Sequence, residues 1–242
     1  MNLLLLQPGE LASDGTAVLT GRRLLHAKEV LQLAKGDALR VGMLGGLRGL
    51  AEVISLDAAA LTLRVALTEP PPPRAGVDLL LAMPRPKALK KIVPAVASFG
   101  ISRLFLLNAA RVEKSFFSSP FVQPAALEEL LCLGLEQARD TLLPEVRVVE
   151  RFRPFVEDEL DGLLGPSPLR LLAHPGVLPL GETLRAEPKR QVALAIGPDG
   201  GWVPFERDLL AQRGFREVSL GERPLRTEVA VSALLGALAA WG

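Results

Sequence analysis

A run of four prolines at residues 70–73 divides the sequence into two parts with different hydrophobic patterns. Proline has no backbone N–H and a fixed φ, so such a run forms a stiff, extended spacer rather than a helix or a central strand. The chain has 242 residues, which is enough for two modest domains. The sequence therefore predicts a first domain over residues 1–68, a linker over residues 69–76 and a second domain over residues 77–242.

The part before the linker has the pattern of a small β-barrel with one helix. Short apolar runs bounded by turn residues predict strands over residues 2–7, 37–44, 47–56 and 60–67. Gly45 and Gly46 predict a hairpin turn between the two middle strands. Apolar residues at helical spacing predict a helix over residues 22–37, with a stop at Gly36.

After the linker, strands and helices alternate. Buried-type apolar runs predict strands over residues 77–83, 102–108, 145–150, 169–175, 191–197 and 215–221. Amphipathic segments predict helices over residues 86–100, 124–144, 153–165, 204–214 and 227–241. Such alternation is typical of an α/β fold, with a mostly parallel sheet and helices on both faces. Ligands of these folds bind beyond the carboxyl ends of the strands.

Composition excludes several functional classes. The single cysteine, Cys132, rules out an internal disulfide. The chain has only two histidines, His26 and His174, so we expect no metal site. The formal net charge of +1 gives no overall electrostatic attraction to nucleic acid, although local patches remain open. No segment has the pattern of a signal peptide or a membrane span, so we expect a cytoplasmic protein that needs no membrane.

A glycine-rich loop follows the predicted strand at residues 191–197. It has the sequence Gly-Pro-Asp-Gly-Gly over residues 197–201, and the spacing matches neither a P-loop nor a dinucleotide fingerprint. Glycines let a ligand approach the backbone closely, but the same residues also suit a strand-to-helix corner. From the loop alone, a ligand site and a simple strand-to-helix corner are equally good interpretations. The carboxylates of Asp199 and Glu206 could likewise contact a ligand or stabilise the turn.

A second loop follows the predicted strand at residues 215–221. Arg223 and Arg226 lie on either side of a Pro-Leu pair, and two guanidinium groups in one loop suit a phosphate or a carboxylate. Thr227 and Glu228 follow at the start of the last helix, where a hydroxyl caps the helix and a carboxylate is favoured by its dipole. A capping role is the simpler interpretation for Thr227.

Two clusters of basic residues are candidates for contacts with an RNA backbone. Arg85, Lys87, Lys90 and Lys91 lie where the first strand of the second domain meets its helix. The other cluster is Arg22, Arg23, His26 and Lys28, on the helix of the first domain. A solvated helix face is the usual alternative for a short run of charge.

The pair of segments "IGPDGGW" and "LGERPLRTEVA" near the carboxyl terminus resembles the RsmE family of 16S ribosomal RNA uridine-N3 methyltransferases, in the SPOUT superfamily. Weaker similarity extends over nearly the full length. The resemblance implies a PUA-like RNA-binding barrel followed by a domain with a deep trefoil knot. It also implies S-adenosylmethionine as cofactor, a homodimer, and ribosomal RNA or the small ribosomal subunit as partner.

The resemblance further implies roles for individual residues. Arg226 would orient the target base or a phosphate, and Glu228 would act as a base. The two basic clusters, rather than the resemblance, provide the predicted RNA contacts: Arg22, Arg23, Arg85, Lys87 and Lys90. Residues of three loops would hold the cofactor: Leu172, His174, Ile196, Gly197, Gly200, Gly201, Leu220 and Leu225.

Some residues depart from the family pattern. Asp199 stands in place of the usual Glu, Pro224 in place of Ile, and Val229 in place of Thr, while the segment at residues 95–100 lacks the usual acid. These departures leave open a methyltransferase that acts on another RNA site. A non-catalytic RNA-binding or ribosome-assembly protein on the same fold is a second alternative, and a nucleotide-dependent enzyme on an unknotted sheet is a weaker third.

Overall fold

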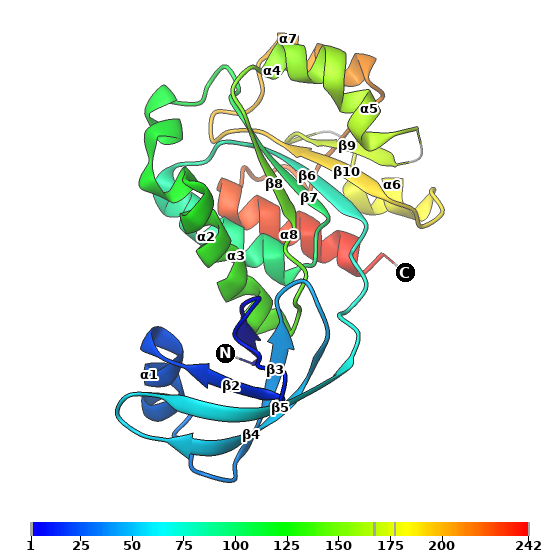
Figure 1. Ribbon diagram of the computed structural model, residues 1–242. Helices are drawn as coiled ribbons and strands as arrows, with labels where there is room; N and C mark the ends of the chain where they lie inside the picture. The colour runs from blue at the N-terminus through cyan, green and yellow to red at the C-terminus, as the bar shows by residue number, and fades with distance from the viewer. Residues whose placement is uncertain (1, 167, 177, 242) are drawn as a thin grey trace. The chain divides into compact units, whose positions relative to one another are not determined.

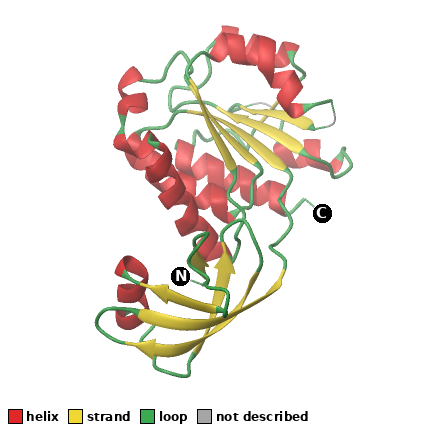
Figure 2. Ribbon diagram, viewed as in Figure 1, coloured by secondary structure: helices red, strands yellow, loops and turns green. Residues whose placement is uncertain are grey.

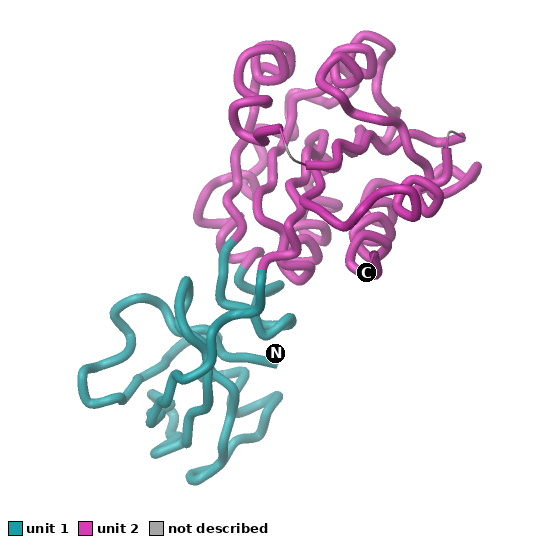
Figure 3. The backbone as a smooth tube through the Cα atoms, turned by 90° about the vertical axis from the view of Figure 1, so that its right-hand side faces the viewer, with its two compact units in different colours: residues 1–73, 132–143 teal, residues 74–131, 144–242 magenta. Residues whose placement is uncertain are grey.

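The computed structural model describes residues 2–166, 168–176 and 178–241. Its contacts divide the chain into two compact units (Figure 3). Unit 1 comprises residues 1–73 and 132–143, and unit 2 comprises residues 74–131 and 144–242. None of the helices in the described part of the chain is both long and apolar enough to cross a membrane.

Unit 1 contains a five-stranded sheet in the order β1-β3-β4-β5-β2, with one helix, α1. The strands are β1 (Leu4–Leu6), β2 (Thr16–Leu19), β3 (Ala38–Met43), β4 (Arg48–Leu56) and β5 (Leu61–Glu69). β1 pairs with β3 in parallel, and the other pairs are antiparallel. Leucine, valine and alanine side chains from the sheet form the core together with Leu24 and Ala27 of α1. Strand β2 is absent from the sequence-based expectations.

The predicted helix at residues 22–37 is shorter in the structure. Helix α1 spans Gly21–Glu29 and is followed by Gln32, which has a φ of +50°. The amide of Leu31 donates to His26 O, and the amide of Leu33 donates to Ala27 O, so the chain closes into a turn. The expectation of a helix up to Gly36 was therefore wrong. The leucines beyond residue 30 keep helical spacing in the sequence, but the chain leaves the helix at the turn around Gln32.

The second segment of unit 1 comes from the carboxyl end of helix α3, which spans Pro124–Ala138. The predicted helix ran to residue 144, but Arg139 has a φ of +58° and ends it. Hydrogen bonds then tie this segment to the amino-terminal sheet. The Asn2 amide donates to Glu136 O over 3.0 Å, and the Thr141 hydroxyl donates to Gly46 O over 2.6 Å. The amino-terminal unit is therefore not one continuous segment.

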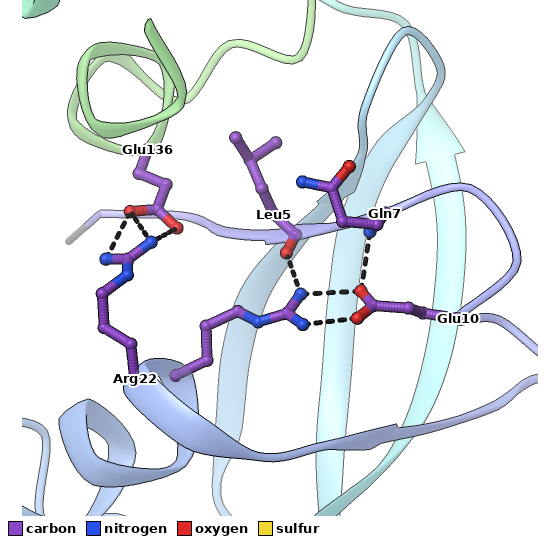
Figure 4. Close-up of polar contacts among 6 residues, drawn as sticks. Leu5, Gln7, Glu10, Arg22 and Glu136 are labelled. Carbon is purple, nitrogen blue, oxygen red and sulfur yellow. Dashed lines mark hydrogen bonds and ion pairs between the residues drawn. The ribbon is translucent and has the colours of Figure 1, made fainter. Parts of the chain in front are cut away.

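Two neighbouring arginines of α1 form ion pairs within unit 1 (Figure 4). Arg23 binds the Glu10 carboxylate through both terminal nitrogens and also donates to Leu5 O over 2.9 Å. Arg22 lies 3.2 Å from the Glu136 carboxylate, which is buried. The hydrogen bond from Arg23, and more weakly one from the Gln7 amide, holds the pKa of Glu10 below its ordinary value.

Unit 2 is built on a six-stranded sheet in the order β11-β9-β10-β6-β7-β8. Every pair in it is parallel. The strands are β6 (Val77–Ala82), β7 (Arg103–Leu107), β8 (Glu145–Val149), β9 (Leu169–Ala173), β10 (Val192–Ile196) and β11 (Arg216–Val218). All residues of β6 and β10 are buried, as expected for strands covered on both faces. The predicted α/β architecture is confirmed.

Helices cover both faces of this sheet (Figure 1). The longer ones are α2 (Pro86–Ser98), α7 (Pro204–Gln212) and α8 (Thr227–Ala239); α4 (Phe152–Pro154), α5 (Leu160–Leu164) and α6 (Leu180–Arg185) are short. A π-helical turn, Phe155–Glu159, joins α4 to α5. Helices α2 and α8 pack together on one face, whereas α4, α5 and α7 lie over the other (Figure 2). Helix α6 is absent from the sequence-based expectations.

Helix α7 begins without a hydroxyl cap. Its N-cap residue is Val203, whose side chain has no acceptor atom. Glu206 replaces the cap, because its carboxylate accepts the Val203 amide over 3.0 Å. The other oxygen of Glu206 accepts the Ala110 amide over 2.6 Å, and the side chain is buried. One buried carboxylate therefore starts α7 and also fixes the loop that follows β7.

The Glu10–Arg23 pair predicts a pH-dependent contribution to stability. Because the pKa of folded Glu10 is lowered, its contribution is full above the unfolded pKa and is lost as pH falls through the folded pKa. We expect Glu10→Gln to lower the free energy of unfolding by about 1–2 kcal/mol at pH 7, and the deficit to shrink below about pH 4. Urea denaturation at several pH values measures this, with exposed Glu29→Gln as the control. A deficit that is independent of pH would contradict the prediction.

Glu206→Gln tests the carboxylate at the start of α7. A glutamine has one acceptor oxygen, so it leaves one of the two amides facing an NH₂ group. We expect the free energy of unfolding to fall by about 1–3 kcal/mol, as measured by thermal and urea denaturation. Asp208→Asn, at an exposed position of the same helix, removes the same charge and is expected to change stability by less than about 0.5 kcal/mol. Equal losses in the two variants would refute the role of Glu206.

Candidate ligand site at the carboxyl ends of β9, β10 and β11

Three loops of unit 2 surround one cavity. They follow β9, β10 and β11, which are neighbours in the parallel sheet, so their carboxyl ends lie at the same edge. The cavity has a volume of about 290 Å³. Its walls are residues 173–175, 196–202, 218–221 and 223–225, with Thr227, Ala230 and Leu234 of α8.

The structure brings together most of the residues that the sequence assigns to a cofactor. The cavity is lined by His174, Ile196, Gly197, Gly200, Gly201, Leu220 and Leu225. Leu172 is the exception, since it lies one residue before the end of β9 and is buried in the sheet. Its neighbour Ala173 lines the cavity instead.

Glycines shape the wall formed by the loop after β10. Gly201 has a φ of +71°, a conformation that residues with a Cβ rarely adopt. A Cβ on Gly197 would lie 3.0 Å from Nε1 of Trp202, so a larger residue there would push the Trp202 ring aside. Trp202 itself is buried and packs against Phe152, with ring centroids 5.8 Å apart. The loop therefore places bare backbone next to the cavity.

Two buried ring nitrogens at the cavity have no hydrogen-bond partner within the described part of the chain. They are Nδ1 of His174 and Nε1 of Trp202, and both residues line the cavity. Most buried polar groups in proteins are hydrogen-bonded, so such atoms at a cavity wall are suited to contact a polar ligand.

The glycine-rich loop is held from two sides. On one side, Asp199 accepts a hydrogen bond from the Thr227 hydroxyl over 2.7 Å and lies 3.2 Å from Arg85. On the other side, the Arg111 guanidinium donates to Gly200 O. Thus the two acidic residues left unsettled by the sequence contact the protein itself: Asp199 contacts α8 and Arg85, and Glu206 contacts the backbone.

The predicted catalytic residues lie at the start of α8. Arg226 is the exposed N-cap residue, and its carbonyl accepts the amides of Val229 and Ala230. Glu228 is half-buried in the first turn. Neither side chain lines the cavity, although Thr227 between them does. The two residues therefore lie beside the cavity rather than in its wall.

The predicted RNA-binding residues divide between the two units. Arg85 and Lys87 are exposed at the start of α2, and Nζ of Lys90 lies 4.6 Å from the ring centroid of Phe121. Arg22 and Arg23 belong to unit 1, where both are engaged in the ion pairs described above.

Sequence reasoning missed Arg111 as part of this region and assigned no role at the cavity to Trp202, although Trp202 lies in the segment "IGPDGGW". Arg111 follows β7 and reaches the loop after β10, and no local motif indicates such a contact. For Trp202, the glycines directly before it were a usable signal, because bare backbone leaves room for a large ring. Among the described residues, no group of three or more histidine, cysteine or acidic side chains is placed to hold a metal ion.

Comparison with known proteins places the chain in a family. A family model described as an RNA methyltransferase domain matches residues 71–239. A relative from Treponema pallidum, named ribosomal RNA small subunit methyltransferase E, is 32% identical over 96% of this chain and 88% of its own length.

Solved structures show the same fold. A ribosomal RNA small subunit methyltransferase E from Neisseria gonorrhoeae, bound to S-adenosyl methionine, is 20% identical, with a TM-score of 0.78 over 98% of this chain and 96% of its own. Lpg2936 from Legionella pneumophila, in complex with the cofactor SAM, is 24% identical, with a TM-score of 0.76 over 99% and 97% of the two chains. The chain belongs to the ribosomal RNA small subunit methyltransferase E family, and residues 71–239 form its RNA methyltransferase domain.

Proposed function

We propose that this protein is an S-adenosylmethionine-dependent methyltransferase of ribosomal RNA. The observation that carries the proposal is the cavity at the ends of β9, β10 and β11, in a chain of this family. The relatives from Treponema pallidum and Neisseria gonorrhoeae are named as ribosomal RNA methyltransferases, and the second was solved with S-adenosyl methionine bound. A ribosomal substrate also agrees with the cytoplasmic location expected from the sequence.

The residues of the cavity fit S-adenosylmethionine. Apolar side chains such as Ile196, Leu220 and Leu225 suit the flat adenine, and the glycine backbone allows close approach. The buried nitrogens of His174 and Trp202 offer hydrogen bonds to polar groups of the molecule. Arg223, also in the wall, suits a carboxylate. The loops after all three strands would therefore hold the cofactor.

When bound, S-adenosylmethionine supplies an electrophilic methyl group on a sulfonium centre. The protein must then orient the target base for in-line attack and deal with its proton. We assign the orienting role to Arg226, whose exposed guanidinium beside the cavity suits the base or a phosphate. Glu228, two residues further into α8, is our candidate for the proton acceptor.

We propose N3 of a uridine in 16S ribosomal RNA as the target. Uracil N3 carries a weakly acidic proton, so its methylation needs such an acceptor or a group that stabilises the anion. Arg85, Lys87 and Lys90 in unit 2 supply positive charge for the RNA backbone. Unit 1, with Arg22 and Arg23, is proposed to bind RNA as a PUA-like barrel, and unit 2 to carry a trefoil knot.

We further propose a homodimer in which α8 takes part. Its exposed side is small and mostly apolar, with Val229, Ala233 and Ala239 open to solvent beside Ser232. Such a stripe suits close packing against a second helix. Light scattering measures the molar mass, and a monomer at micromolar concentration would contradict this part of the proposal.

Gly197→Ala tests the cofactor cavity. The added Cβ presses on the Trp202 ring, so we expect S-adenosylmethionine to bind roughly tenfold more weakly. Calorimetry measures the affinity, with Gly162→Ala as the matched control, because nothing lies within 4 Å of the Cβ position there. A wild-type protein that gives no heat at high micromolar cofactor would overturn the methyltransferase proposal and favour a non-catalytic RNA-binding protein.

Arg226→Ala and Glu228→Gln test the catalytic assignments. Removing a group that acts in the transition state lowers kcat, and we expect losses of about 10²–10⁴-fold for Glu228→Gln. Since neither side chain lines the cavity, the affinity for the cofactor is expected to stay within about threefold of wild type. Labelled methyl transfer to small-subunit particles, followed by mapping of the modified base, measures both rate and target. Label on a base other than uridine would overturn the substrate assignment.

A further inference from the structure

The carboxylate of Asp199 connects three separate elements of unit 2. Oδ1 accepts a hydrogen bond from the Thr227 hydroxyl over 2.7 Å, and Oδ2 lies 3.2 Å from Nε of Arg85. Asp199 belongs to the loop after β10, Thr227 is the first residue of α8, and Arg85 directly precedes α2. Because both oxygens have partners in the protein, this carboxylate is better suited to holding the structure than to contacting a ligand.

The two contacts differ in strength. Thr227 is only 4% exposed, so its hydroxyl depends on Asp199 as an acceptor, and a charged acceptor makes a strong hydrogen bond. The side chains of Arg85 and Asp199 are 68% and 48% exposed, so water screens their ion pair and it contributes little. The link to α8 is therefore the one that fixes the geometry.

This link acts on the part of α8 that carries the proposed chemistry. Thr227 lies between Arg226 and Glu228, so the hydrogen bond anchors the helical turn from which both side chains project. The far side of the same loop is fixed by Arg111, which donates to Gly200 O. Among the described residues, it is the side-chain hydrogen bond that ties the first turn of α8 to the glycine-rich loop.

We propose that Asp199 is a positioning residue that acts through Thr227 to aim the first turn of α8 at the cavity. This inference rests on the proposed methyltransferase function and deepens it. A bond of this kind matters most in the transition state, where small errors in orientation are costly. Its loss therefore lowers kcat more than it weakens cofactor binding.

Substitutions of Thr227 separate the hydroxyl from the shape of the side chain. Thr227→Val removes the hydroxyl at nearly constant volume, and Thr227→Ser keeps it. We expect Thr227→Val to lower kcat about tenfold and, because Thr227 lines the cavity, to weaken cofactor binding by a smaller factor, whereas Thr227→Ser is expected to stay within about twofold of wild type in both. Thr183→Val is the matched control, since Thr183 is also buried in unit 2 but its hydroxyl has no partner within the described residues.

Substitutions of Asp199 test the other end of the same bond. Asp199→Asn keeps an acceptor oxygen and is expected to stay close to wild type, whereas Asp199→Ala is expected to match Thr227→Val. If the two residues act through one bond, the double variant Asp199→Ala with Thr227→Val loses no more activity than either single variant. Cofactor binding by calorimetry shows in each case that the variant is folded.

The outcomes distinguish this proposal from the function on which it rests. An active wild type in which Thr227→Val is as fast as Thr227→Ser overturns the positioning role alone. Fully additive losses in the double variant also overturn it, because they show that the two residues act independently. A wild type that neither binds S-adenosylmethionine nor methylates RNA overturns the proposed function, and the positioning role falls with it.

Discussion

The candidate site depends on the parallel pairing of the strands in unit 2. Parallel strands present their carboxyl ends at one edge of the sheet, and β9 pairs with both β10 and β11. The strand ends at Ala173, Ile196 and Val218 are more than twenty residues apart in sequence, yet the loops that follow them surround the same cavity. Strand β10 is hydrogen-bonded to a strand on each side, β6 and β9, and this pairing fixes its place in the sheet.

A few buried polar groups then give the loops their shape. Glu206 accepts two backbone amides, and Thr227 donates to Asp199. Each bond adds only about 0.5–1.5 kcal/mol net for neutral partners and about 1.5–3 kcal/mol with a charged one. A loop conformation that left one of these buried groups without a hydrogen-bond partner would cost about 1–3 kcal/mol. These contacts therefore favour a single loop conformation. A carboxylate near a cavity therefore need not bind a ligand, because its oxygens can already be occupied by hydrogen bonds to the protein.

A basic cluster in the sequence does not show whether its charges are already paired with acidic residues of the protein. The cluster on α1 was proposed for RNA from its sequence alone, but Arg23 is held by Glu10 and Leu5 O, and Arg22 faces Glu136. Glu136 is more than a hundred positions away in sequence, so no local pattern indicates the pair. Lys87 is exposed in unit 2, and Arg85, although it pairs with Asp199, is still 68% exposed, so these two residues are the more accessible positive charge.

The sequence by itself determined the alternation of strands and helices after the proline run and the positions of the loops after β9, β10 and β11. These features are local, because burial, turn chemistry and helix starts follow from neighbouring residues. It failed at the ends of α1 and α3, where Gln32 and Arg139 take positive φ and turn the chain earlier than the apolar spacing predicts. It also failed for residues 132–143, which join unit 1 through contacts distant in sequence. Only the tertiary structure decided that Asp199 binds Thr227 and that Arg111 reaches Gly200, because such pairs are set by the order of strands in the sheet.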